Sequence, residues 1–270
     1  MTILLHELRL RRTGLLVWSL AVSALVAACV LIYPEMADQM DAVSQTFAQM
    51  GGFSAAFGMD QVDFGQFMGF FAVECGTCLG LGGGLFAALT GISALAGEEA
   101  SHTASFLLTH PVSRPRVVGE KLLAAAVQIL LFHLTVSAVS LLAMAAIGER
   151  PDGKRLALLL LAGLLLELEV MALCFGISAF LRRGGGGIAM GLALGLYFLN
   201  LLANLTEGAA FLKYLTPFAY ADGADIVSAG ALESGPLAVG AVLSAAGILA
   251  AFWFYCLSLI HISEPTRRTP

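Results

Sequence analysis

Six long apolar runs, separated by short polar segments, dominate the pattern of this 270-residue chain. Each run has close to the roughly 20 residues that an α-helix needs to cross about 30 Å of hydrocarbon. Lipid offers no partner to backbone N–H and C=O groups, so segments of this kind cross it as helices. The pattern therefore predicts an all-α, polytopic membrane protein with six transmembrane helices. The predicted spans are 15–33, 67–96, 122–147, 156–181, 184–205 and 237–256.

Composition supports a membrane protein and excludes other classes. The chain is 59% hydrophobic and only 12% charged, with a mean hydropathy of +0.87, whereas a soluble domain carries about 25% charged residues. The net charge is −5 and no basic stripe is present, so nucleic acid is not an expected partner. The five cysteines lie in or beside apolar runs, which is not the pattern of a secreted disulfide framework. Membrane lipid is the expected surrounding.

The distribution of lysine and arginine predicts the orientation of the chain. A cytoplasmic N-terminus places eight basic residues of the loops inside and four outside. The first outer loop, residues 34–66, then carries five acidic residues and no Lys or Arg. The inner residues are Arg9, Arg11, Arg12, Arg114, Arg116, Lys121, Arg182 and Arg183, and the outer ones are Arg150, Lys154, Arg155 and Lys213.

The N-terminal segment TILLHELRLRR, residues 2–12, is amphipathic when drawn as a helix. Three leucines share one face, and Arg9 and Arg12 lie elsewhere. This pattern predicts a short helix in the inner membrane interface before the first span. A plain positively charged segment preceding a membrane anchor is the alternative.

The second apolar run is rich in small residues. Cys75 and Cys78 have CxxC spacing, but no strand–helix unit surrounds them, so close helix packing is the favoured interpretation. None of the glycines between 76 and 91 is followed by Lys-Ser or Lys-Thr, which excludes a phosphate-binding loop. We expect no catalytic residue, metal or cofactor on this chain.

A connector dense in charge, GEEASHTASFLLTHPVSRPRVVGEK at 97–121, separates the second and third spans. Ser101 is placed to cap a short helix that presents the apolar residues 106–108 and ends before Pro111. A basic turn with two prolines follows. A solvated loop obeying the positive-inside bias would explain the arginines, but neither the paired glutamates nor the apolar face. The connector therefore predicts a contact surface.

The segment LAGEEASHTASFLLTHPVSRPRVVGEKLL resembles the first cytoplasmic connection of ABC transporter permeases of the type-2 (ABC-2) exporter family. In that family an acidic pair leaves the second helix, and Gly-Thr, Leu-Leu, Pro-x-Ser-Arg and a Lys opening the third helix follow. His102 stands where the family usually has Gly. The matching positions are Glu98, Glu99, Thr103, Leu107, Leu108, Pro111, Ser113, Arg114 and Lys121.

This resemblance implies that the connector is a coupling helix seated in a groove of a separate ABC ATPase subunit. ATP and magnesium would then be bound by that subunit, and this chain would not be an enzyme. A second permease chain, identical or homologous, would complete the transporter. The expected location is a bacterial or archaeal cytoplasmic membrane, with the N-terminus in the cytoplasm. The apolar composition leaves the transported substrate open.

Two other functions compete with this interpretation. A secondary transporter or channel would be favoured by inverted repeats or matched broken helices, and no convincing repeat is present. An Abi-type intramembrane protease uses an acidic pair followed by Arg and a Phe-x-x-x-His motif. Glu98 and Glu99 with Phe106 and His110 imitate this set, but no Arg follows at the needed spacing and His110 falls in the connector.

Two carboxylates, Glu167 and Glu169, lie near the middle of the fourth predicted span. Each costs about 2.5–3.5 kcal/mol at that depth on insertion scales. They project about 200° apart on a helix, so one neighbour cannot serve both. The favoured interpretation is that both are buried against neighbouring helices, either neutral because burial raises the pKa or bonded to His133, Asn200 or Asn204. The alternative is that one of them lines the translocation path at the seam between two permease chains and senses a cationic or polar cargo.

The last residues have a foreign character. LSLIHISEPTR, residues 257–267, matches one reading frame of a transposase adapter used in sequencing libraries. We therefore expect a single permease domain over 1–256, and residues 257–270 to be derived from an adapter.

Overall fold

The computed structural model describes residues 2–48, 51–100, 113–181 and 185–258. This part of the chain is helical and contains no strand. The elements are α1 (Thr2–Ala48), α2 (Gly52–Ala56), α3 (Phe67–Phe70), the π-helix η1 (Phe71–Cys75), α4 (Gly76–Ala100), α6 (Arg114–Ile147), α7 (Gly153–Ser178), α8 (Gly186–Leu205), the 3-10 helix η2 (Glu207–Leu215), α9 (Gly223–Ala229) and α10 (Ser234–Ser258).

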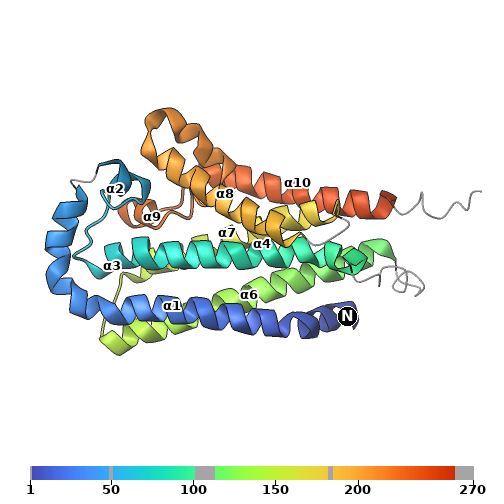
Figure 1. Cartoon of the computed structure of the whole chain (residues 1–270), viewed down its shortest axis with the longest axis horizontal. Helices are drawn as coiled ribbons and strands as arrows, with labels where there is room; N and C mark the ends of the chain where they lie inside the picture. The colour runs from blue at the N-terminus through green and yellow to red at the C-terminus, as the bar shows by residue number, and fades with distance from the viewer. Residues whose placement is uncertain (1, 49–50, 101–112, 182–184, 259–270) are drawn as a thin grey trace, which may run out of the picture.

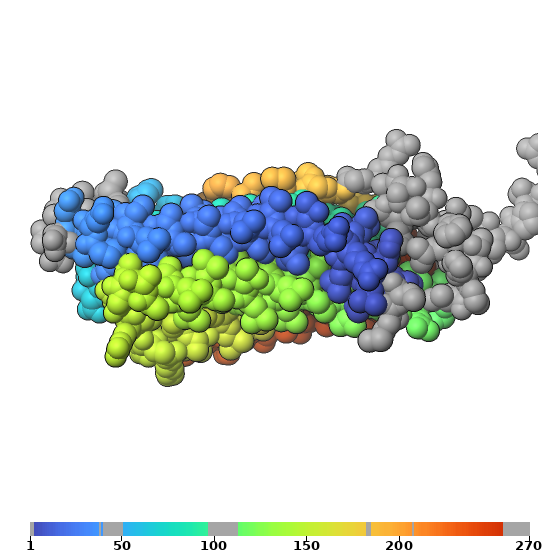
Figure 2. Space-filling view, turned by 90° about the horizontal axis from the view of Figure 1, so that it is seen from below, coloured from blue at the N-terminus to red at the C-terminus, as the bar shows by residue number. Residues whose placement is uncertain are grey.

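Six of these segments are long and apolar enough to cross a membrane, which confirms the all-α fold with six candidate transmembrane helices. They run as an up-and-down bundle in which α4 packs mainly against α7 at the centre (Figure 1). Figure 2 shows α1 and α6 side by side along one face. The candidate spans are Ile3–Ala37, Phe67–Ala96, Arg114–Ile147, Gly153–Ser178, Gly186–Leu205 and Ser234–Tyr255.

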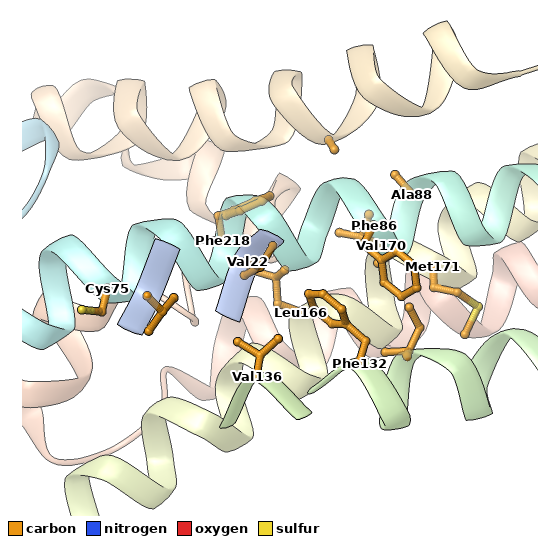
Figure 3. Packing of buried hydrophobic residues seen from close by; sticks show 14 of the residues in the cluster. Val22, Cys75, Phe86, Ala88, Phe132, Val136, Leu166, Val170, Met171 and Phe218 are labelled. Atoms are coloured by element: carbon orange, nitrogen blue, oxygen red, sulfur yellow. The ribbon is translucent and has the colours of Figure 1, made fainter. Parts of the chain in front are cut away.

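The core of the bundle is formed where α4, α6 and α7 meet (Figure 3). Phe86 of α4 stacks on Phe132 of α6 with ring centroids 4.7 Å apart. Glycines allow the helix axes to approach, because a Cβ on Gly91 would collide with the Met171 carbonyl oxygen of α7. This agrees with the prediction that small residues of the second run serve close packing.

The first helix differs from its prediction at both ends. Residues 2–12 do not form a separate interfacial helix; they are the first turns of the continuous α1. The helix also continues past Pro34 to Ala48, where a loop was predicted. Hydropathy marks the part of a helix that lipid can solvate, but backbone hydrogen bonding extends α1 beyond that part. Pro34 lies inside the helix and removes one backbone donor without ending it. The polar residues that follow Pro34 are mostly compatible with a helix.

The predicted coupling helix and most of the predicted adapter-derived tail lie outside the described residues.

Candidate functional site

Some of the predicted coupling residues lie in the helices that flank the connector, and the others lie within it. Glu98 and Glu99 belong to the last turn of α4, which ends at Ala100. Ser113 is the N-cap of α6 and Arg114 is its first residue. Thr103, Leu107, Leu108 and Pro111 lie outside the described residues. The contact with an ATPase therefore stays a prediction.

Lys121 has a different environment from the surface contact that the sequence suggested. It is only 2% exposed, and its ammonium donates to Glu7 Oε1 at 2.6 Å and to the Ala94 carbonyl oxygen at 3.0 Å. The reason is its place in α6: two turns inside the helix, it faces α1 and α4. Lys121 therefore binds its own chain.

Arg11 extends this arrangement into a network that we name the Lys121 cluster, made of Glu7, Arg11, Ser93, Ala94 and Lys121. Arg11 Nε donates to Glu7 Oε2 at 3.1 Å, and its Nη2 donates to the Ser93 carbonyl oxygen at 2.6 Å. The cluster links α1, α4 and α6 at the end of the bundle from which the connector departs. The sequence did not indicate this cluster, because Glu7 and Lys121 are 114 residues apart in the chain.

The two carboxylates of α7 are both buried and both bonded, to different neighbours. Glu167 is 3% exposed, and its Oε2 lies 3.1 Å from His133 Nδ1 of α6. Glu169 Oε2 accepts a hydrogen bond from the Tyr220 hydroxyl at 2.9 Å. Burial and the charge of Glu169 raise the pKa of Tyr220, so the phenol keeps the proton that it donates. The predicted burial and the predicted His133 contact are confirmed.

Glu167 also borders a small internal space. With His133, Leu159, Leu160 and Gly163 it lines a cavity of about 30 Å³. This volume exceeds the about 10–15 Å³ that one water needs. The cavity beside the Glu167–His133 pair is therefore large enough for a water molecule, whereas Glu169 is bonded to Tyr220 and does not line it.

Asn200 and Asn204 bond to a carboxylate that the sequence reading did not single out. Their Nδ2 groups donate to Asp222 Oδ2 at 3.3 and 3.0 Å, and Asp222 Oδ1 caps α9 by accepting from the Ala224 N–H at 3.1 Å. Burial, together with repulsion from Asp225, raises the pKa of Asp222. The available signal was the segment YADGAD, residues 220–225, which is acidic beside an apolar span.

The ammonium group of Lys213 forms an ion pair with Asp225 Oδ2 at 3.1 Å. Burial lowers the pKa of Lys213, but attraction from Asp225 outweighs this and raises it overall, with a smaller contribution from Asp222. No described Lys or Arg forms an ion pair with Asp222 itself. Within the described residues no group of three or more His, Cys, Asp or Glu is arranged to hold a metal ion.

The comparison with known families covers nearly the whole chain. A profile described as ABC-2 family transporter protein matches residues 1–260. No curated protein matches the chain. The matched region contains all six candidate transmembrane helices, the connector with its acidic pair, and the buried carboxylates. This chain therefore belongs to the ABC-2 transporter family.

Proposed function

We propose that this chain is the membrane-spanning permease subunit of an ATP-binding-cassette exporter. It would move a substrate across the cytoplasmic membrane using ATP that a separate subunit hydrolyses. Family membership supports this function, and so does a charged connector between α4 and α6. A second permease chain would complete the pore, and ATP with magnesium would bind to the ATPase.

The observation that carries the coupling mechanism is the Lys121 cluster. The connector leaves α4 after Ala100 and enters α6 at Arg114. Lys121 ties α6 to Ala94 of α4 and to Glu7 of α1 through contacts that are almost fully buried. A displacement of the connector would therefore move the three helices together, because separating them would leave buried charges unpaired.

Charge reversal tests this function. The double variant Glu98→Lys with Glu99→Lys is expected to abolish co-purification of the ABC ATPase subunit from detergent, while the chain still inserts. A matched control reverses two exposed carboxylates at the opposite end of the bundle, Asp60→Lys with Glu233→Lys, and is expected to retain the ATPase. Equal co-purification by both double variants, with equal transport, would refute a coupling role for the acidic pair.

We also propose that Glu167, not Glu169, contributes to the translocation path. Glu167 shares a cavity with His133, so its carboxylate can meet a polar or cationic group that enters. Glu169 is held by Tyr220 and faces α10, since a Cβ on Gly240 would collide with its carboxylate. Its proposed role is to hold α7 against α10.

A secondary transporter driven by protons is the second candidate, and the Glu167–His133 pair favours it. Ionisable pairs inside membranes commonly mark proton relays. The two functions differ in their energy source. Transport that persists in vesicles with a pH gradient but no ATPase would support the second candidate, and transport that requires ATP would support the first.

A further inference from the structure

The helix α9 lies at the end of the bundle opposite the N-terminus (Figure 1). A second cavity lies beside it and is lined by Asp222 and Gly223, where α9 begins. Its volume is about 50 Å³, which is enough for several waters or one small polar group. The start of α4, the end of α8 and the segment before α9 enclose it. Its polar lining consists of Thr77, Tyr197, Asn200 and Asp222. The orientation predicted from the sequence places this cavity on the outer side of the membrane.

Asn200 provides an acceptor that has no partner. Its side chain is 5% exposed, and no donor among the described residues reaches Oδ1. Flipping the side-chain amide would not give Oδ1 a donor, because Nδ2 donates to Asp222 Oδ2. After the flip, the amide oxygen would face the carboxylate oxygen of Asp222. A buried amide oxygen that lines a cavity and lacks a donor indicates a ligand that donates hydrogen bonds.

Asp222 adds a negative charge that no described cation neutralises by contact. Its three hydrogen bonds come from Asn200, Asn204 and the Ala224 N–H, which are all neutral donors. A carboxylate has about four acceptor positions, so one position remains. The cavity therefore offers one charge and at least two free acceptor positions to a cationic donor.

Aromatic rings restrict the kind of cation that fits. Tyr197 and Phe218 meet edge to face with centroids 5.5 Å apart, and both line the cavity together with Phe57. Ring faces attract ammonium groups. A divalent metal ion would instead require several carboxylate or carbonyl oxygens, and this cavity has a single carboxylate.

The walls of the cavity are fixed by close backbone packing. Gly223 lies directly against η1, since a Cβ there would collide with the Ala72 carbonyl oxygen. Gly58 has a positive φ of 67°, and a Cβ on it would come within 2.5 Å of Ala224 Cβ. The π-helix η1 contributes Ala72 and Val73 to the lining, and π turns occur frequently at functional sites.

We propose that this cavity binds a protonated primary amine, with the ammonium group donating to Asn200 Oδ1 and Asp222 and lying against Tyr197 and Phe218. The amine can belong to a soluble molecule or to a lipid headgroup, because both present the same chemistry. The inference is independent of the ATPase contact, so its failure would leave the proposed function unchanged.

The test is binding of n-butylammonium to the full chain in phosphatidylcholine nanodiscs, measured by saturation-transfer difference NMR. Asp222→Asn is expected to weaken binding by about tenfold or more, because a charge-assisted hydrogen bond is lost. Asn200→Leu, of similar volume, is expected to weaken it too. Asp225→Asn is the matched control, since it removes a neighbouring carboxylate that does not line the cavity, and it is expected to stay within about twofold of the wild type.

Two further arms make the result decisive. Butylammonium binding is measured again in nanodiscs that contain phosphatidylethanolamine. If binding is lost, the site binds a lipid headgroup; if binding persists, it binds a soluble amine. Neutral n-butanol is expected to show no dependence on Asp222. The proposal is overturned if Asp222→Asn and Asp225→Asn bind butylammonium equally, or if sodium displaces it at equal concentration. If Asp222→Asn does not fold, unchanged binding by Asn200→Leu overturns it equally.

Discussion

The Lys121 cluster gives the most quantitative prediction. Lys121→Met keeps the length of the side chain but removes its ammonium group, which leaves Glu7 buried without that partner. Removing one member of a buried ion pair costs about 3–5 kcal/mol. Because Arg11 still bonds to Glu7 at 3.1 Å, the loss should fall near the lower end, about 3 kcal/mol in the free energy of unfolding.

The assay is equilibrium unfolding in mixed detergent micelles, followed by tryptophan fluorescence. Arg116→Met is the matched control on the same helix, since its partner Glu120 is 3.0 Å away but the arginine side chain is 63% exposed. An exposed pair contributes about 0–1 kcal/mol, so this control should change little. Equal losses in the two variants would refute the assignment of the cluster as a buried anchor.

A double variant separates the pair from the rest of the cluster. Combining Glu7→Gln with Lys121→Met removes both charges, so its cost should be smaller than the sum of the two single variants by about 1–3 kcal/mol. Strict additivity would mean that the two side chains do not stabilise each other, although they lie 2.6 Å apart.

Three further predictions address packing, titration and the path. Gly91→Ala should destabilise the bundle by about 1–3 kcal/mol through overpacking, whereas Gly195→Ala, with no atom within 4 Å of the added Cβ, should be neutral or stabilising in the same assay. The pKa of Asp222 is raised in the folded protein. Its contribution to stability is therefore largest below the ordinary aspartate pKa, near pH 4, and is lost as pH rises through the raised pKa. The stability of Asp222→Asn relative to the wild type should increase with pH in amine-free buffer. Glu167→Gln should assemble with the ATPase yet lose cargo-stimulated ATP hydrolysis, and Glu169→Gln should retain it; full stimulation in both variants would show that neither carboxylate serves the path.

The sequence predicted the parts of this fold that hydropathy determines. Six apolar runs became six candidate membrane helices, because lipid leaves the backbone no other structure. The depth of Glu167 and Glu169 required partners, and the histidine available at matching depth, His133, is one of them. Helix ends were predicted less well, since α1 continues beyond the apolar run into polar sequence, where hydropathy does not indicate a helix.

Apart from the Glu167–His133 contact, the long-range polar contacts could not be predicted. Lys121 and Glu7 meet because α1 and α6 pack side by side, and no local pattern specifies that neighbour. Asp222 lies between the fifth and sixth predicted spans, and Asn200 and Asn204 donate to it. Only the packing of α8 against the segment before α9 brings these residues together.

The most direct test of a permease driven by a separate ATPase is a photocross-link from the connector. A benzoylphenylalanine placed at Leu107 should form an adduct with the ATPase subunit in the assembled complex, whereas the same group at Phe53, which is exposed at the opposite end of the bundle, should not. An adduct of equal yield from Phe53, or none from Leu107 in a complex that still co-purifies, would contradict the account.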